Sequence, residues 1–127
     1  ASMSPAEKLY SQLLQIKYQM EDYANSGEYN TANTFGHFLN EYIHALRVGK
    51  TDFSKQISLD NTKLSRLLHG REEPNETVYV RLEIHSNKII PAVTWYRVHQ
   101  KYRILNLLRN KQLHNKEKKH VKFTVGV

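Results

Sequence analysis

The chain of 127 residues is long enough for one domain with a small extension, and its apolar core needs no metal or crosslink. It has no cysteine, which excludes a disulfide framework and a thiolate metal site, and no run approaches the roughly 18 apolar residues of a membrane span, so we expect a cytoplasmic protein. The formal net charge is +7, but residues 1–35 hold two lysines against four acidic residues, so only the rest of the chain suits a polyanionic partner such as nucleic acid.

Apolar residues recur at helical spacing near the start of the chain and predict a first helix over residues 4–25. The stripe consists of Leu9, Leu13, Ile16, Met20 and Tyr23, and the cluster of Asn25, Ser26 and Gly27 ends the helix. We expect this stripe to pack on its own domain or on a dimer mate. Residues 1–33 are interpreted as an N-terminal helical extension.

A second helix is predicted from Phe35 to Leu46, ending near Gly49. Its apolar face holds Phe35, Phe38, Leu39, Tyr42, Ile43 and Leu46. His37, Glu41 and His44 share another side at a spacing that can hold a metal, but no further acid lies nearby in the sequence to support one. A solvated polar face is favoured, and we expect neither a metal nor a cofactor.

Residues 49–71, GKTDFSKQISLDNTKLSRLLHGR, predict two short helices joined by a tight turn. Helices this short need tertiary packing, which Phe53, Ile57, Leu64 and Leu67 can supply from one ridge on each helix. Asp60 is placed to cap the second helix by accepting from the backbone N–H of Thr62 or Lys63, and Gly70 ends it.

The outward face of this second short helix carries Asn61, Thr62, Lys63, Ser65 and Arg66, with Arg71 just beyond. Asn and Arg can make the bidentate contacts that distinguish adenine and guanine in a major groove, whereas Lys, Thr and Ser suit phosphates or either edge. Any surface helix of a basic domain can carry such a face. The pairing of two short helices across a turn favours DNA binding.

A last helix is predicted to begin near Pro91, with core or dimer residues Trp95, Val98, Tyr102, Leu105 and Leu108 on one side. Residues 109–127 form a basic tail, for which solvation and disorder are expected. Two alternatives stay open: the tail reaches DNA phosphates, or Val121, Phe123 and Val125 form a short edge strand.

Residues 36–105 resemble the lambda-repressor-like (Xre) helix-turn-helix family and, within it, the HigA-type antitoxins. The matching pieces are FSKQI, NTKLSRLLHGR, VRLEIHSNKIIP, and Trp95 seven residues before Tyr102. The resemblance implies an all-α protein with a lambda-repressor-like five-helix DNA-binding domain over residues 34–108, an extra N-terminal helix and a basic C-terminal tail. Ser58 departs from the family, which usually has Gly at the turn between the motif helices, and GREEPNE replaces the commoner linker.

Carried over by position, the resemblance places base-edge or groove contacts at Asn61, Thr62, Lys63 and Arg66, and phosphate contacts at Lys50, Thr51 and Arg71, with Ser65 on the same DNA-facing side. It implies a homodimer on a palindromic double-stranded operator with half-sites about 34 Å apart. It also implies a repressor of its own operon that holds a small basic ribonuclease toxin inactive. The acidic first helix is a candidate for the toxin contact.

Three other functions remain open at this point. The chain can be a helix-turn-helix regulator without a toxin partner, or an interaction module that has lost DNA binding. It can also be a small basic ribonuclease, because chains rich in Lys, Arg and His can cleave RNA by general acid and base catalysis. Since there is no nucleophile motif, HExxH pair or Walker loop, we expect no enzymatic activity.

Overall fold

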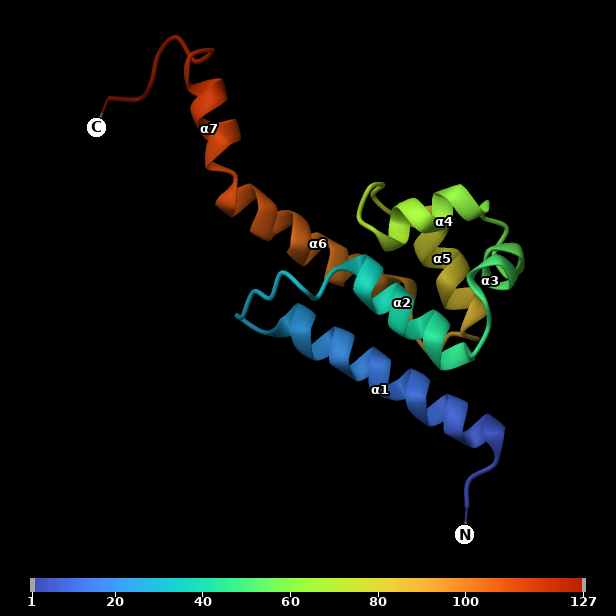
Figure 1. Cartoon of the computed structure of the whole chain (residues 1–127). Helices are drawn as coiled ribbons and strands as arrows, with labels where there is room; N and C mark the ends of the chain where they lie inside the picture. The colour runs from blue at the N-terminus through green and yellow to red at the C-terminus, as the bar shows by residue number, and fades with distance from the viewer. Residues whose placement is uncertain (1, 127) are drawn as a thin grey trace.

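The computed structural model describes residues 2–126, which form seven helices and no strand (Figure 1). The helices are α1 (Pro5–Asn25), α2 (Phe35–Leu46), α3 (Lys50–Gln56), α4 (Asn61–Leu68), α5 (Glu76–His85), α6 (Ala92–Arg109) and α7 (Lys111–Lys118). The predicted all-α class is therefore confirmed. No helix within residues 2–126 has the length and apolar character needed to cross a bilayer.

Helix α1 lies along α2 and α6 and belongs to the same core (Figure 1). It begins with a capping box, in which Ser4 Oγ accepts from the Glu7 backbone N–H and the Glu7 carboxylate accepts from the Ser4 N–H. Leu13, Ile16 and Met20 are buried on its inner side. The predicted apolar stripe thus packs on its own chain, and α1 shares one hydrophobic core with the helices that follow it.

The C-terminal end of α1 is fixed by a buried lysine of α6. The ammonium group of Lys101 donates to the backbone carbonyl of Tyr23 and, at 2.9 Å, to that of Ser26, and it lies 3.9 Å from the centre of the Tyr23 ring. Burial lowers the pKa of Lys101, and the nearby Glu28 carboxylate opposes that shift. A charge is tolerated here because it satisfies carbonyls at the helix end and faces an aromatic ring.

Replacing Lys101 with Met is expected to destabilise the protein by about 2 kcal/mol, because the carbonyls of Tyr23 and Ser26 lose their donor. Urea unfolding followed by circular dichroism measures the loss, and proteolysis of the loop after α1 should become faster. Lys111→Met is the matched control, since Lys111 is exposed on α7. Equal midpoints for the two variants would contradict this role for Lys101.

Helix α2 occupies the centre of the molecule and contacts α1, α4 and α6. Its rings meet Trp95 of α6 edge to face, with centroid distances of 5.6 Å from Phe35 and 5.8 Å from Tyr42. Trp95 is fully buried, and its indole N–H has no hydrogen-bond partner among the described residues. Tyr42 also meets Phe53 of α3 edge to face, with a centroid distance of 6.0 Å, so the aromatic cluster links α3 to α2 and α6.

Helices α3 and α4 are joined by residues 57–60 and show the packing expected from the sequence. Phe53, Ile57, Leu64 and Leu67 are buried, as predicted. Asp60 Oδ1 accepts from the Lys63 N–H at 2.7 Å, which confirms the predicted cap. Ser58 adopts φ +54°, so this turn does use the left-handed geometry for which glycine is better suited.

A polar network fastens α3 to α5. His85 Nδ1 lies 2.6 Å from the Tyr42 hydroxyl and Nε2 lies 2.7 Å from Gln56 Oε1. Because an amide oxygen only accepts, Nε2 carries a proton; burial lowers the pKa of His85, and in the neutral imidazole that this favours, Nδ1 accepts from the Tyr42 hydroxyl. Arg81 of α5 also donates to the carbonyls of Ile57 and Ser58 at the end of α3. These contacts set the position of the turn before α4.

Stability is expected to fall when the pH is lowered from 7.5 to 5.5. Burial lowers the pKa of His85 and His99 below the usual 6.5, although the Glu73 carboxylate opposes the shift at His99. The unfolded chain therefore takes up protons near pH 6.5 before the folded chain does, at up to about 1.4 kcal/mol per pH unit for each histidine. Urea midpoints at pH 7.5, 6.5 and 5.5 measure the effect.

The matched variants for this pH dependence are His85→Gln, which should flatten part of the slope, and His114→Gln on the exposed helix α7, which should leave it unchanged. A midpoint that stays constant or rises toward pH 5.5 would contradict the neutral, buried state of both histidines.

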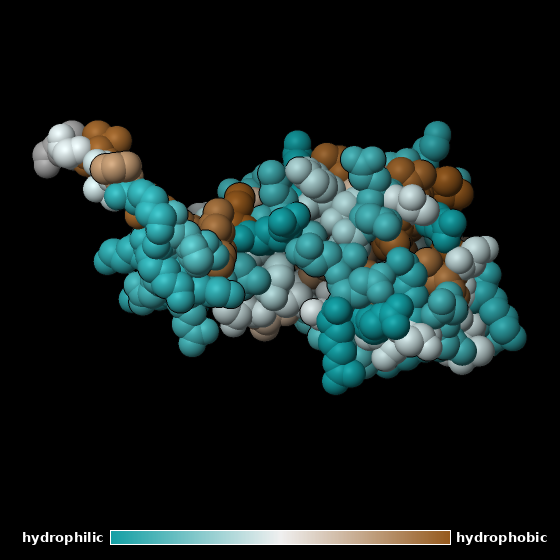
Figure 2. All heavy atoms as spheres, turned by 90° about the horizontal axis from the view of Figure 1, so that it is seen from above, coloured by the Kyte–Doolittle hydropathy of each residue, from teal (hydrophilic) through white to brown (hydrophobic). Residues whose placement is uncertain are grey.

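The sequence predicts a disordered tail or a short edge strand after residue 109, and this prediction is wrong for residues 111–118. They form α7, whose N-terminus is capped by Asn110 Oδ1 accepting from the Leu113 N–H at 3.1 Å. Residues 119–126 contain no strand. Helix α7 buries no residue and projects from the body as a largely hydrophilic arm (Figures 1 and 2). Leu108, expected to be a core or dimer residue, is 68% exposed, so it is not part of the core of this chain.

Candidate nucleic-acid interface

Helix α4 lies on the upper side of the body in Figure 1, and its polar face is exposed. Asn61, Thr62, Ser65 and Arg66 are exposed and Lys63 is half-buried, while Leu64 and Leu67 point into the core. Seen from above, the surface of the body is largely hydrophilic, with its apolar side chains in separate patches (Figure 2). The five predicted residues of α4 therefore share one accessible side.

Glu72, in the loop after α4, lies against this face and was not among the predicted site residues. Its Oε2 is 2.8 Å from Lys63 Nζ, and its Oε1 accepts from Arg66 Nε at 2.9 Å. Hydrogen bonds from Lys63 and then Arg66 lower the pKa of the Glu72 carboxyl. The two basic side chains nearest to the centre of the face are therefore paired with a carboxylate.

The chain returns to α4 because Gly70 adopts φ +70°, and the Arg71 N–H donates to the Arg66 carbonyl at 2.8 Å. This C-terminal cap brings residue 72 back beside residues 63 and 66. The sequence signal was Gly70 followed by two acids, GREE, which places a carboxylate within reach of the last turn of the helix.

Lys50 and Thr51, predicted to bind phosphates, lie beside the first half of α4. They line a shallow depression of about 270 Å³ together with Asn61, Ser65 and His69. The structure thus brings four of the eight predicted residues around one hollow and Lys63 and Arg66 together at Glu72. Arg71 is exposed and makes no ion pair within residues 2–126.

The side chain of Asn61 is held in place by a hydrogen bond from α3. Ser54 Oγ lies 2.8 Å from Asn61 Oδ1 and 2.7 Å from the Thr51 carbonyl oxygen, so its hydroxyl joins the starts of α3 and α4. A bidentate contact with adenine uses both the oxygen and the nitrogen of an Asn amide. Asn61 Oδ1 has a second lone pair with which it can accept from adenine while it keeps Ser54, so Ser54 sets the orientation in which the amide meets a base.

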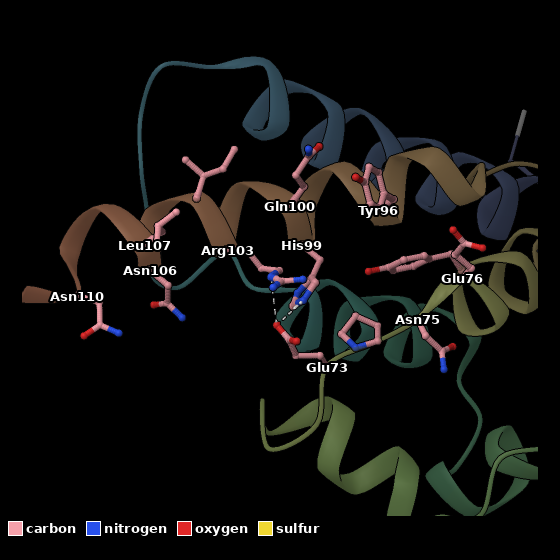
Figure 3. Close-up of a pocket in the computed structure, with 13 residues that line it drawn as sticks. Glu73, Asn75, Glu76, Tyr96, His99, Gln100, Arg103, Asn106, Leu107 and Asn110 are labelled. Carbon is pink, nitrogen blue, oxygen red and sulfur yellow. Dashed lines mark hydrogen bonds and ion pairs between the residues drawn. The ribbon is translucent and has the colours of Figure 1, made fainter. Parts of the chain in front are cut away.

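A larger groove lies elsewhere, between the start of α5 and the C-terminal half of α6 (Figure 3), with a volume of about 710 Å³. Within it, Glu73 Oε1 lies 3.3 Å from His99 Nε2 and 3.5 Å from Arg103 Nε. The groove contains none of the eight predicted site residues. Its ion pairs join Glu73 to α6, whereas the neighbouring Glu72 pairs with α4.

No three His, Cys, Asp or Glu side chains come together as a metal site in the described part of the chain. His37, Glu41 and His44 lie exposed on α2, the arrangement that a solvated polar face has.

Comparison with known proteins gives no match: no family model fits the chain, and no curated protein or solved structure is recognisably similar to it. The assignment to a class of protein therefore rests on the sequence motif and on the side chains of α3 and α4.

Proposed function

We propose that this protein is a sequence-specific DNA-binding repressor in which α3, the turn and α4 act as a helix-turn-helix and α4 is the recognition helix. On this view α2 to α6 are the five helices of a lambda-repressor-like domain. The observation that carries the proposal is the shared accessible face of Lys63, Arg66, Thr62 and Ser65, flanked by Lys50 and Thr51 of α3.

The dimensions and charge of this face suit a major groove. An α-helix with its side chains is about 10–12 Å in diameter, and a major groove about 12 Å wide admits it. Arg66 and Lys63 supply donors to base edges or phosphates, and Lys50 adds a cation beside them. Carboxylates also lie at this face, since Asp60 caps the start of α4 and Glu72 pairs with Lys63 and Arg66.

The resemblance to HigA-type antitoxins supports a narrower proposal, in which the protein is a homodimer that represses its own operon and holds a small basic ribonuclease toxin. Helix α1 is the candidate toxin contact by charge, but its inner side is committed to α2 and α6. Only its outward side, which exposes Tyr10, Tyr18 and Asp22, is free to meet a partner. Substitutions on that side test the contact without removing part of the core.

The proposal is tested by fluorescence anisotropy with the promoter DNA immediately upstream of the gene and with scrambled DNA of equal length, at two salt concentrations. A preference for the promoter that survives added salt supports a sequence-specific autorepressor. Equal and equally salt-sensitive binding to both fragments contradicts it. Analytical ultracentrifugation of the complex then reports whether two chains bind one operator.

A ribonuclease is the second candidate, favoured by His99, Glu73 and Arg103 in the groove between α5 and α6. A general acid or base must reach the substrate within hydrogen-bond distance, however, and the His99 side chain is only 10% exposed. Its ring stacks on Tyr102 and meets Phe35 edge to face. Packing explains His99 better than catalysis does, and cleavage of a fluorogenic RNA that is lost in His99→Asn would reverse this preference.

A further inference from the structure

Glu72 is an unusual neighbour for a surface meant to bind DNA, because phosphates repel a carboxylate. It nevertheless sits within the basic pair, bonded to both Lys63 and Arg66 at 2.8 and 2.9 Å. The exposed fractions of the three side chains are 27% for Glu72, 30% for Lys63 and 46% for Arg66, so the cluster is partly shielded from water. Partial burial and two partners make this pairing more persistent than an isolated surface ion pair.

Glu72 binds Arg66 in a way that leaves the terminal guanidinium nitrogens available for a contact with a base. The bond uses Arg66 Nε, and no hydrogen bond within residues 2–126 occupies the terminal Nη1 and Nη2 groups. These two groups can donate together to O6 and N7 of guanine, the commonest specific contact in a major groove. A guanidinium fixed through Nε loses less rotamer entropy when it makes that contact.

Glu72 also weakens the competing, sequence-independent contact. Lys63 and Arg66 can reach a backbone phosphate only by leaving the carboxylate or by bringing its negative charge toward the phosphate. Both routes cost free energy, whereas a base edge is neutral and carries no such penalty. The carboxylate therefore acts on the two kinds of contact in opposite directions.

We propose that Glu72 is a positioning residue that sets DNA specificity, by presenting the Nη groups of Arg66 to guanine and by restraining Lys63 and Arg66 from phosphates. This inference rests on the proposed function of α4 and assigns a role to a residue outside the predicted interface. The expected partner is a guanine that lies opposite α4 in each half-site.

The test compares Glu72→Gln with Glu73→Gln in the full chain. Both variants remove one negative charge at adjacent positions, but Glu73 pairs with His99 and Arg103 of α6 rather than with α4. DNA ligands are selected from a random pool with the wild-type protein, and affinities for the selected and scrambled DNA are measured at two salt concentrations. The NMR relaxation of Arg66 Nε–Hε in the free protein is recorded in parallel, with Arg71 as the unpaired reference.

For Glu72→Gln we expect tighter binding to scrambled DNA, a steeper salt dependence, and a ratio of specific to nonspecific affinity lowered about tenfold. Glu73→Gln should leave that ratio within about twofold of wild type, because only general electrostatics change. Arg66 Nε should be more ordered than Arg71 Nε in the wild type and lose that order in Glu72→Gln alone.

Different results overturn different claims. Equal ratios in wild type, Glu72→Gln and Glu73→Gln overturn the role of Glu72 while leaving α4 as the DNA-binding helix. An Arg66 Nε as mobile as that of Arg71 overturns the positioning role without reference to DNA. A wild-type protein that selects no sequence overturns the proposed function and the role of Glu72 with it.

Discussion

Operator affinity is expected to fall at least about 100-fold when Lys63 and Arg66 are both replaced by glutamate. Each good bidentate or charged contact to DNA is worth about 1–3 kcal/mol, and the double variant replaces two attractive contacts with repulsion. The new carboxylates would also face Glu72, with which both wild-type side chains are paired. The anisotropy titration against the selected or promoter DNA measures the loss.

The matched control is Lys116→Glu with Lys118→Glu on the exposed helix α7, which changes the net charge by the same amount. It should weaken binding to all DNA modestly and leave the preference for the operator in place. Circular dichroism and urea unfolding should show both double variants folded, because α4 is held by Leu64 and Leu67 rather than by its charges. A Lys63 and Arg66 double variant that keeps operator preference would contradict the assignment of α4.

Much of the local structure was predictable because its causes lie within a few residues. The spacing of Leu13, Ile16 and Met20 marks the buried side of α1, and Asp60 precedes α4 by the one residue that capping requires. The departure at Ser58 likewise predicts a strained turn, and its φ of +54° agrees. Patterns of this kind depend on helix period and cap geometry, which the sequence carries directly.

Contacts between distant segments were not predictable from such patterns. Lys101 binds carbonyls at the end of α1, some 75 residues earlier in the chain, and no helical spacing of residues predicts that contact. Glu72 reaches Lys63 and Arg66 only because the loop turns back at Gly70. For the candidate site, the sequence therefore identified the basic side chains of α4 but not the carboxylate that holds them.

Helix α7 is a different case. The sequence contains features that favour a helix there, but the high charge of residues 109–127 led to the prediction of a disordered tail. Lys, Gln, Leu and Glu are good helix formers, and Asn110 is a favourable cap. A helix of eight residues with no buried side chain has little tertiary support. Charge density alone therefore does not separate a disordered tail from a short solvated helix.

Gly36 is the point at which α2 lies against the backbone of α4, and its replacement is expected to have the largest effect on stability. A Cβ placed on Gly36 would lie 2.3 Å from the Leu68 carbonyl oxygen and 3.0 Å from that of Leu67, both backbone atoms at the end of α4. Neither can move without displacing the helix. Gly36→Ala is therefore expected to destabilise the protein by about 3 kcal/mol, at the upper end of the cost of overpacking, and to lower Tm by on the order of 10 °C.

Gly27→Ala is the matched control, because a Cβ there meets nothing within 4 Å and the residue lies in the exposed loop after α1. It should leave Tm unchanged or raise it slightly, since alanine restricts the unfolded chain. If Gly36→Ala unfolds at the temperature of Gly27→Ala, α4 does not rest on the start of α2 as described. Leu67 and Leu68 lie on the same helix as Lys63 and Arg66. If folded Gly36→Ala binds DNA at low temperature with a reduced preference for the operator, the displacement of α4 has also moved its DNA-binding face.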